Sequence, residues 1–130
     1  MANAKPKILA IDDELGVRES YRMIFKWDTE IVFAETYDAG IEEIAKGGYH
    51  AVISDLGSIQ GKTGLDAIEA AKQYAPNIPF YLISASHDAL RLQAQEAGAG
   101  MPNFEMVDKP FDVNDLHAKV LAAATEYMQQ

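Results

Sequence analysis

Five short apolar runs alternate along the chain with longer segments whose apolar residues recur at helical spacing. The runs predict strands at Lys7–Ile11, Glu30–Ala34, 51–54, Phe80–Ser84 and 105–107. Three of them are almost continuously apolar, which is typical of strands that are covered on both faces. Strict alternation of strands and helices predicts a parallel sheet with right-handed connections and helices on both faces. The expected fold class is therefore α/β, a doubly wound three-layer sandwich.

The segments between the runs carry apolar stripes, as expected for helices that pack one face on a sheet. The stripes consist of Val17, Tyr21, Ile24 and Phe25; Ile41, Ile44 and Ala45; Ile68, Ala71 and Ala75; Leu90, Ala94 and Ala97; and Val113, Leu116, Val120 and Tyr127. We interpret all of them as core-packing faces rather than ligand sites. Two helix starts are indicated by weak capping boxes, Thr63 with Asp66 and Asp112 with Asp115.

Composition narrows the classes of function. A chain of 130 residues with 48% hydrophobic residues suits one domain with a real core, and we expect a single domain over residues 1–130. The absence of cysteine excludes disulfides, thiolate metal sites and a cysteine nucleophile, and agrees with a cytoplasmic location. The net charge of −9 opposes binding to nucleic acid. Neither a signal peptide nor a membrane span of roughly 20 apolar residues is expected.

Charged side chains stand at the ends of three predicted strands. Asp12 and Asp13 follow the first strand, Asp55 follows the third, and Lys109 comes shortly after the fifth. All strands of a parallel sheet open at one carboxyl edge, where ligands bind, so we expect these four groups to converge on one pocket. Taken alone, the Asp12-Asp13 pair is equally well explained as a helix cap beside a solvated acid, and Lys109 as an ordinary surface lysine.

A cluster of carboxylates favours a bound cation. Two carboxylates about 4 Å apart repel by roughly 4 kcal/mol at an effective dielectric near 20, so three together would protonate or recruit a divalent ion. Oxygen ligands with room for water suit Mg²⁺ better than Zn²⁺. Ser84 ends the fourth strand and adds a hydroxyl at the same edge. Alone, it would be interpreted as a helix cap, a role that Ser86 could fill instead.

The chain resembles the receiver domain of bacterial response regulators in four motifs: Asp12-Asp13, Asp55, Ser84-Ala85 and Lys109-Pro110-Phe111, each after a predicted strand. The resemblance covers nearly the whole chain, and the four motifs in this order are specific although each is weak alone. It implies the flavodoxin-like (βα)5 fold of the chemotaxis-regulator type, with strand order 2-1-3-4-5.

The resemblance also implies a function. Asp55 would be the phosphoacceptor, whose carboxylate takes a phosphoryl group from a sensor histidine kinase or a phosphotransfer protein. Lys109 would contact that group, and Ser84 would supply the hydroxyl that moves towards it. Phosphorylation adds roughly −1.5 to −2 charge and can thereby reposition a loop. The chain would thus be a switch of a two-component phosphorelay rather than an enzyme.

The same resemblance implies a magnesium site. Its ligands would be Asp12, Asp13, Asp55 and the backbone carbonyl of Gly57, with Asp12 acting partly through water. The proposed cofactor is Mg²⁺. Because Gly57 and Ser86 would flank the phosphoryl group with little bulk, we expect only modest protection of an aspartyl phosphate from water.

The chain departs from the family pattern in three places. The loop at residues 56–63 has no proline, and Gly64 falls one residue later than in the pattern. Residues 100–103 resemble an insertion before the fifth strand. Met106 stands where a switching Tyr or Phe is usual, with Phe104 as the nearest aromatic residue. We call the predicted fourth helix, fifth strand and fifth helix the output face. We therefore expect this face to repack without an aromatic rotamer switch.

Two other functions are alternatives. One is a phosphate-independent interaction module with a receiver fold. The other is an aspartate-nucleophile phosphatase, which would need a second acid at the position of Gly57. The chain is either a stand-alone receiver that binds a downstream protein or one piece of a longer regulator with an output domain, and a phosphorylation-dependent dimer is compatible with both.

Overall fold

A computed structural model describes residues 4–57, 61–85 and 89–130, so Ser86 and part of the 56–63 loop lie outside the described residues. The described residues form one parallel sheet in the order β2-β1-β3-β4-β5. Its strands are β1 (Lys7–Ile11), β2 (Glu30–Ala34), β3 (Ala51–Asp55), β4 (Phe80–Ser84) and β5 (Phe104–Asp108). The predicted fold class and strand order are confirmed.

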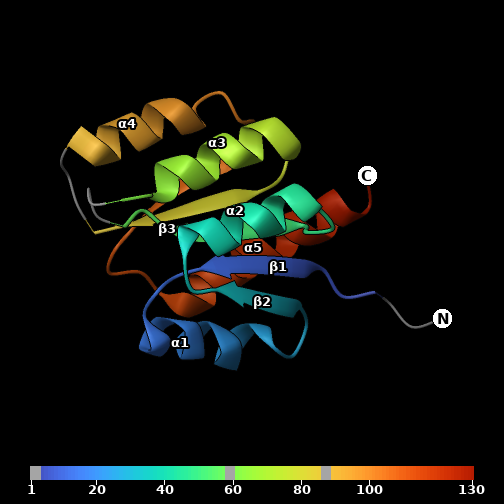
Figure 1. The fold of residues 1–130 in the computed structure, drawn as a ribbon. Coiled ribbons are helices and arrows are strands. Elements are labelled where there is room, and N and C mark those ends of the chain that lie inside the picture. The colour runs from blue at the N-terminus through green and yellow to red at the C-terminus, as the bar shows by residue number, and fades with distance from the viewer. Residues whose placement is uncertain (1–3, 58–60, 86–88) are drawn as a thin grey trace.

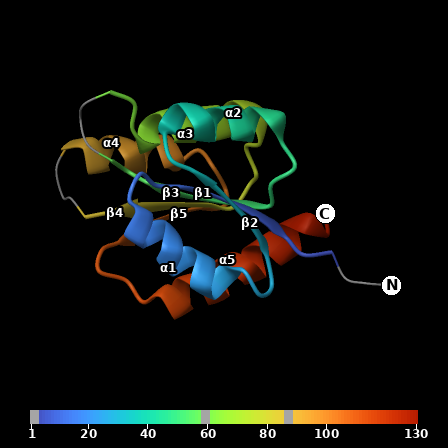
Figure 2. The same ribbon diagram turned by 60° about the horizontal axis from the view of Figure 1, so that its bottom comes forward.

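In the described residues, five helices cover the two faces of this sheet, as Figure 1 illustrates. They are α1 (Leu15–Phe25), α2 (Tyr37–Lys46), α3 (Gly64–Tyr74), α4 (Ala89–Gly98) and α5 (Val113–Met128). Figure 2 shows α1 and α5 on one face and α2, α3 and α4 on the other. Among the described helices, none is long and apolar enough to cross a membrane.

Two strands are longer than the sequence predicts. β3 also includes Asp55, which pairs with Ile83, and β5 also includes Phe104 and Asp108, which pair with Phe80 and Ser84. The residues added at the carboxyl ends, Asp55 and Asp108, are polar, so an apolar run cannot reveal them, although their backbones still pair in the ladder. Asp55 is therefore the last residue of β3 and does not follow it.

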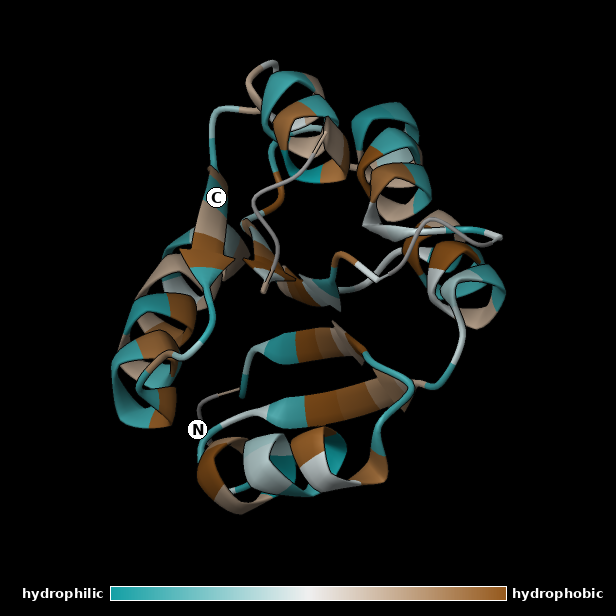
Figure 3. Ribbon diagram, turned by 90° about the vertical axis from the view of Figure 1, so that its left-hand side faces the viewer, coloured by the Kyte–Doolittle hydropathy of each residue, from teal (hydrophilic) through white to brown (hydrophobic). Residues whose placement is uncertain are grey.

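Alternate residues of the central strands face the two helical layers, as the pleat of a strand requires. Leu9 and Ile11 pack under α2, α3 and α4, whereas Ile8 and Ala10 pack under α1 and α5. Figure 3 shows the strands mostly in hydrophobic colours and the helices in mixed ones. The predicted stripes supply most of the helical side of this core. Ala45 is an exception, because it is exposed.

The capping box at the start of α3 is present. The Thr63 side chain accepts the Leu65 N–H, and the Asp66 carboxylate accepts the Thr63 N–H at 2.7 Å. At α5, Asp112 caps the helix by accepting the N–H groups of residues 114 and 115. These caps place the helix starts directly after the loops that leave β3 and β5.

The β5 edge accommodates the residues that resemble an insertion. Met101 is buried in the core under α2, α3 and α4. The ring of Phe104 stacks on Phe80 with 5.9 Å between centroids and covers Gly98, where an added Cβ would overlap it. The register pairs Phe104 with Phe80, at the far end of β4 from Ser84. Phe104 therefore does not supply an aromatic ring beside Ser84.

Candidate functional site

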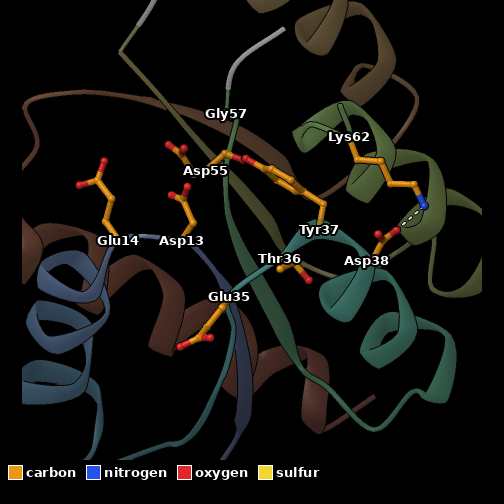
Figure 4. A pocket seen from close by; sticks show the side chains of 9 residues that line it. All are labelled: Asp13, Glu14, Glu35, Thr36, Tyr37, Asp38, Asp55, Gly57 and Lys62. Atoms are coloured by element: carbon orange, nitrogen blue, oxygen red, sulfur yellow. Dashed lines mark hydrogen bonds and ion pairs between the residues drawn. The ribbon is translucent and has the colours of Figure 1, made fainter. Parts of the chain in front are cut away.

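A cavity of about 530 Å³ opens at the carboxyl edge of the sheet (Figure 4). Its walls come from the turn after β1, the turn after β2 with the first turn of α2, the end of β3 and the segment just before α3. The lining residues are Asp13, Glu14, Glu35, Thr36, Tyr37, Asp38, Asp55, Gly57 and Lys62. Because β1 and β3 are the neighbours between which the strand order reverses, this is where ligands bind in an open α/β sheet.

Asp55 and Lys109 form an ion pair at this edge. The Lys109 Nζ atom lies 3.1 Å from Asp55 Oδ1, and the two side chains are 32% and 21% exposed. Burial alone would lower the pKa of Lys109, but the charge and hydrogen bond of Asp55 outweigh burial and raise that pKa above its usual value. The ammonium therefore stays charged at neutral pH beside the Asp55 carboxylate.

Lys109 reaches Asp55 from the neighbouring strand end. Its backbone N–H donates to the Ser84 carbonyl oxygen at 2.8 Å, and its peptide bond to Pro110 is cis. The side chain lines a second cavity of about 520 Å³ beside Tyr21 and Phe111. Glu14 lines both cavities, so the two are adjacent.

The two adjacent acids divide into two roles. Asp12 is buried, and its Oδ1 atom accepts the Glu14 N–H at 2.9 Å, while Asp13 is exposed and lines the cavity. Burial raises the pKa of Asp12, the Glu14 N–H lowers it, and the negative charge of Asp55 raises it further. Asp12 thus stabilises the turn before α1 through a local hydrogen bond, and it also feels the charge of Asp55.

Ser84 is buried at the end of β4. It pairs in register with Asp108 and accepts the Lys109 N–H through its carbonyl, but it does not line the 530 Å³ cavity. The structure therefore brings Asp13, Asp55 and Gly57 into one cavity, joins Lys109 to Asp55 by an ion pair, and puts Asp12 and Ser84 behind this surface.

Several residues around the cavity were missed in the sequence. The buried Arg18 donates to the Asp12 carbonyl oxygen and pairs with Glu35, each at 3.0 Å. Tyr37 donates its hydroxyl to the Asp55 carbonyl oxygen at 2.8 Å, and Lys62 forms an ion pair with Asp38. A strand-end rule applied also to β2 would have found Glu35, Tyr37 and Asp38.

The oxygen donors of this cavity suit a hard cation. Asp13 and Asp55 offer carboxylates, and Gly57 offers a backbone carbonyl, in the same cavity. No three acidic or histidine side chains among the described residues form a ready metal cage. Mg²⁺ is bound by proteins through one or two carboxylates and keeps several waters. The donor set therefore fits Mg²⁺ with part of its water shell and does not fit Zn²⁺, which takes a closed set of nitrogen and sulfur ligands in structural sites.

The family model of the response regulator receiver domain matches residues 8–121 of this chain. The chain belongs to this family. Receiver domains are components of two-component systems and are typically phosphorylated switches with Mg²⁺ at the phosphorylation site. The matched span contains each residue that the sequence predicts for the site of this receiver domain: Asp12, Asp13, Asp55, Gly57, Ser84 and Lys109.

Solved structures share the fold of this receiver domain. A response regulator receiver protein from Sinorhizobium medicae is 23% identical, with 95% of this chain and 97% of that chain covered and a TM-score of 0.77. A CheY-like receiver domain protein from Methanospirillum hungatei is 19% identical, with 97% and 98% covered and a TM-score of 0.81. The beryllofluoride-activated NtrC4 receiver domain, described as a dimer, is 22% identical, with 93% and 98% covered and a TM-score of 0.74. No curated protein sequence matches the chain.

Proposed function

We propose that this receiver domain is the phosphoacceptor switch of a two-component phosphorelay, with Asp55 as the nucleophile. The observation that carries the proposal is the place of Asp55, which is partly exposed in an acidic cavity and lies 3.1 Å from the Lys109 ammonium. A carboxylate on a rigid strand end, beside a fixed positive charge, is what attack on a phosphoryl group requires.

In the proposed reaction, an Asp55 carboxylate oxygen attacks the phosphorus of a phosphohistidine on a kinase or phosphotransfer protein. The new O–P bond forms as the N–P bond breaks, and the imidazole leaves with the electron pair of that bond. Phosphoryl transfer depends mainly on positioning and charge neutralisation. The Lys109 ammonium supplies one positive charge where the phosphoryl oxygens would lie, and it would then pair with the phosphoryl group.

Asp13, Asp55 and the Gly57 carbonyl are proposed to hold Mg²⁺, with Asp12 acting partly through water. When bound, the ion supplies the remaining neutralisation of phosphoryl charge. Asp12 suits an indirect role, because one of its oxygens already accepts the Glu14 N–H. Burial, and after it the negative charge of Asp55, raises the pKa of Asp12 because both disfavour its carboxylate form, and a nearby cation would stabilise that form.

Ser84 is proposed to relay the change to the output surface. Its backbone is tied to Lys109, and β4 and β5 pair to their ends at Ser84 and Asp108. Arg91 of α4 pairs with Asp108 at 2.5 Å, so α4 is tied to β5 beside the site. A shift of the Ser84 hydroxyl towards a phosphoryl group would act on this junction. Met106 then takes part as packing and not as an aromatic switch.

We also propose that the domain spans residues 1–130, acts in the cytoplasm, and passes its signal to a downstream protein or to an output domain. The dimer described for the activated NtrC4 receiver domain supports a phosphorylation-dependent dimer as one form of output. The chemistry is that of a switch and not of a turnover enzyme, since Gly57 cannot transfer a proton two residues after Asp55.

Intact-protein mass spectrometry tests the proposal directly. The protein is incubated with Mg²⁺ and acetyl phosphate, and we expect it to gain the mass of one phosphoryl group. Asp55→Asn should gain none. If the wild type takes up no phosphate from either acetyl phosphate or phosphoramidate, the chain is a phosphate-independent module. Steady turnover of p-nitrophenyl phosphate that depends on Asp55 would instead indicate a phosphatase.

A further inference from the structure

Tyr37, at the start of α2, forms a hydrogen bond with the backbone of Asp55, the proposed nucleophile at the end of β3. It is the first residue of α2, and the preceding Thr36 caps that helix by accepting the Ala39 N–H. The Tyr37 hydroxyl donates to the Asp55 carbonyl oxygen at 2.8 Å. Figure 4 shows its ring extending from α2 to the end of β3. The contact joins two turns that are distant in sequence.

The hydroxyl of Tyr37 is the donor of this bond, because a backbone carbonyl oxygen can only accept. A neutral donor towards a carbonyl adds no charge to the site, so its effect is on geometry.

Hydrogen bonds hold successive backbone groups of Asp55 and Leu56, where the chain leaves β3. The Asp55 carbonyl oxygen also accepts the Ser54 hydroxyl at 3.0 Å. The Leu56 N–H donates to Ile83, and the Leu56 carbonyl accepts the Gly64 N–H at 2.8 Å. Ser54 lies on β3 itself, whereas Tyr37 brings in α2. The direction in which the chain leaves Asp55 therefore depends on α2 as well as on the sheet.

Gly57 and the Tyr37 ring share one space. Gly57 has φ +80°, and an added Cβ would overlap the Tyr37 hydroxyl. The sequence suggested open space beside Gly57, but the tyrosine fills this side of it. A second tie comes from Lys62, which pairs with Asp38, the next residue of α2. The first turn of α2 thus contacts both the beginning and the end of the β3–α3 loop.

We propose that Tyr37 is a positioning residue for the phosphorylation site. By bonding the Asp55 carbonyl and packing against Gly57, it fixes the peptide segment from which the Asp55 carboxylate and the Gly57 carbonyl face the cation. The hydroxyl of Tyr37 is engaged by the Asp55 carbonyl, so in this proposal Tyr37 acts through these two residues. The inference rests on the proposed function and adds to it a residue outside the four motifs.

The test uses Tyr37→Phe, which removes the hydroxyl and keeps the ring. Mg²⁺ is titrated without a phosphodonor and followed by NMR of the Gly57 and Asp55 amides. We expect the Mg²⁺ affinity to fall about 2- to 10-fold, the size expected for one neutral hydrogen bond. Phosphorylation by acetyl phosphate should slow at low Mg²⁺ and recover at saturating Mg²⁺. A purely structural tyrosine would not produce this split.

Tyr49→Phe is the matched control. Its hydroxyl also donates to a neighbouring group, Glu43 at 2.5 Å, but at the other end of α2 from the cavity. It should leave the Mg²⁺ titration unchanged. Gly57→Ala gives a second test: its Cβ displaces the Tyr37 hydroxyl, so its effect on Mg²⁺ affinity should be smaller in the Tyr37→Phe background than in the wild type.

The outcomes separate the inference from the proposed function. If the wild type is phosphorylated and Tyr37→Phe binds Mg²⁺ as tightly as the wild type, the positioning role is wrong and the phosphoacceptor role stands. An equal loss in Tyr49→Phe would also overturn the positioning role. If the wild type takes up no phosphate and binds no Mg²⁺, both proposals fail. Should Tyr37→Phe not fold, Tyr37→Met, which also lacks the hydroxyl, replaces it and must show the lower Mg²⁺ affinity.

Discussion

The centre and the β5 edge of the sheet differ in how tightly they are packed. The residues of β3 before Asp55 are buried, whereas every residue of β5 before Asp108 is only partly buried. The helices beside them differ in the same way, since α3 buries five residues and α4 buries two. Regions with fewer buried contacts change conformation at lower cost. The proposed nucleophile thus stands on the rigid part, and the proposed output surface is the part that is easier to repack.

The largest expected effect concerns the centre. Asp55→Asn should abolish phosphate uptake completely, because an amide oxygen is a poor nucleophile and the phosphorylated product cannot form. Asp108→Asn, one residue before Lys109 on the edge strand, should keep the uptake. Mass spectrometry after incubation with acetyl phosphate measures both. Loss of uptake in both variants would show that the edge takes part in the chemistry and would break the comparison.

A matched pair of core substitutions compares how much packing in β4 and in β5 contributes to the free energy of unfolding. Leu82 of β4 and Met106 of β5 are partners in the parallel register and pack in the same core cluster, but Leu82 is fully buried and Met106 is not. Leu82→Ala should lower the free energy of unfolding by about 2–5 kcal/mol. Met106→Ala should cost roughly half as much, in proportion to its smaller burial. Urea unfolding measures both, and equal costs would contradict the difference in packing.

Asp12 provides a test at the floor of the site. Its folded pKa is raised above the value of 3.8 for the unfolded chain, so the wild type loses stability as the pH rises through these two values. Asp12→Asn, which can still accept the Glu14 N–H, should therefore be more stable than the wild type at pH 7 without metal. The gain should vanish in acid, where Asp12 is protonated.

Addition of Mg²⁺ should narrow or reverse this gain, because the wild type has the carboxylate that favours a cation. Thermal unfolding at several pH values, with and without Mg²⁺, checks the prediction. A variant that is less stable than the wild type at pH 7 in the absence of metal would show that the buried charge of Asp12 is compensated in the folded protein.

The smallest expected effect is on the edge. Asp108→Asn breaks the charge pair with Arg91, in which the Asp108 side chain is 57% exposed. Partly exposed pairs contribute at most about 1 kcal/mol, so the unfolding midpoint should hardly move. Any change should appear instead in the NMR shifts of α4 on activation with beryllofluoride. Unchanged shifts in both states would show that the Arg91–Asp108 contact has no part in the output.

Much of the fold could be predicted because alternation of apolar runs and helical stripes reports the sheet directly. The meeting of Asp13, Asp55 and Lys109 followed from one topological fact, that parallel strands end at a common edge. The sequence allowed one acid of the Asp12-Asp13 pair to accept a backbone N–H while the other is solvated, but which of these two identical neighbours is buried depends on the turn and could not be predicted. The strand-end rule, applied to β2, would have placed Tyr37 at this edge, but its hydrogen bond to a backbone carbonyl 18 residues away leaves no periodic pattern, so its partner could not be predicted.

The overlap between a Cβ at Gly57 and the hydroxyl of Tyr37 has a consequence for reading related sequences. The two positions compete for one volume, so they should vary together. Relatives with a larger residue at the position of Gly57 should have a smaller one, or one without a hydroxyl, at the position of Tyr37. In relatives with such a paired replacement, the start of the β3–α3 loop should be held by a contact other than the tyrosine hydroxyl.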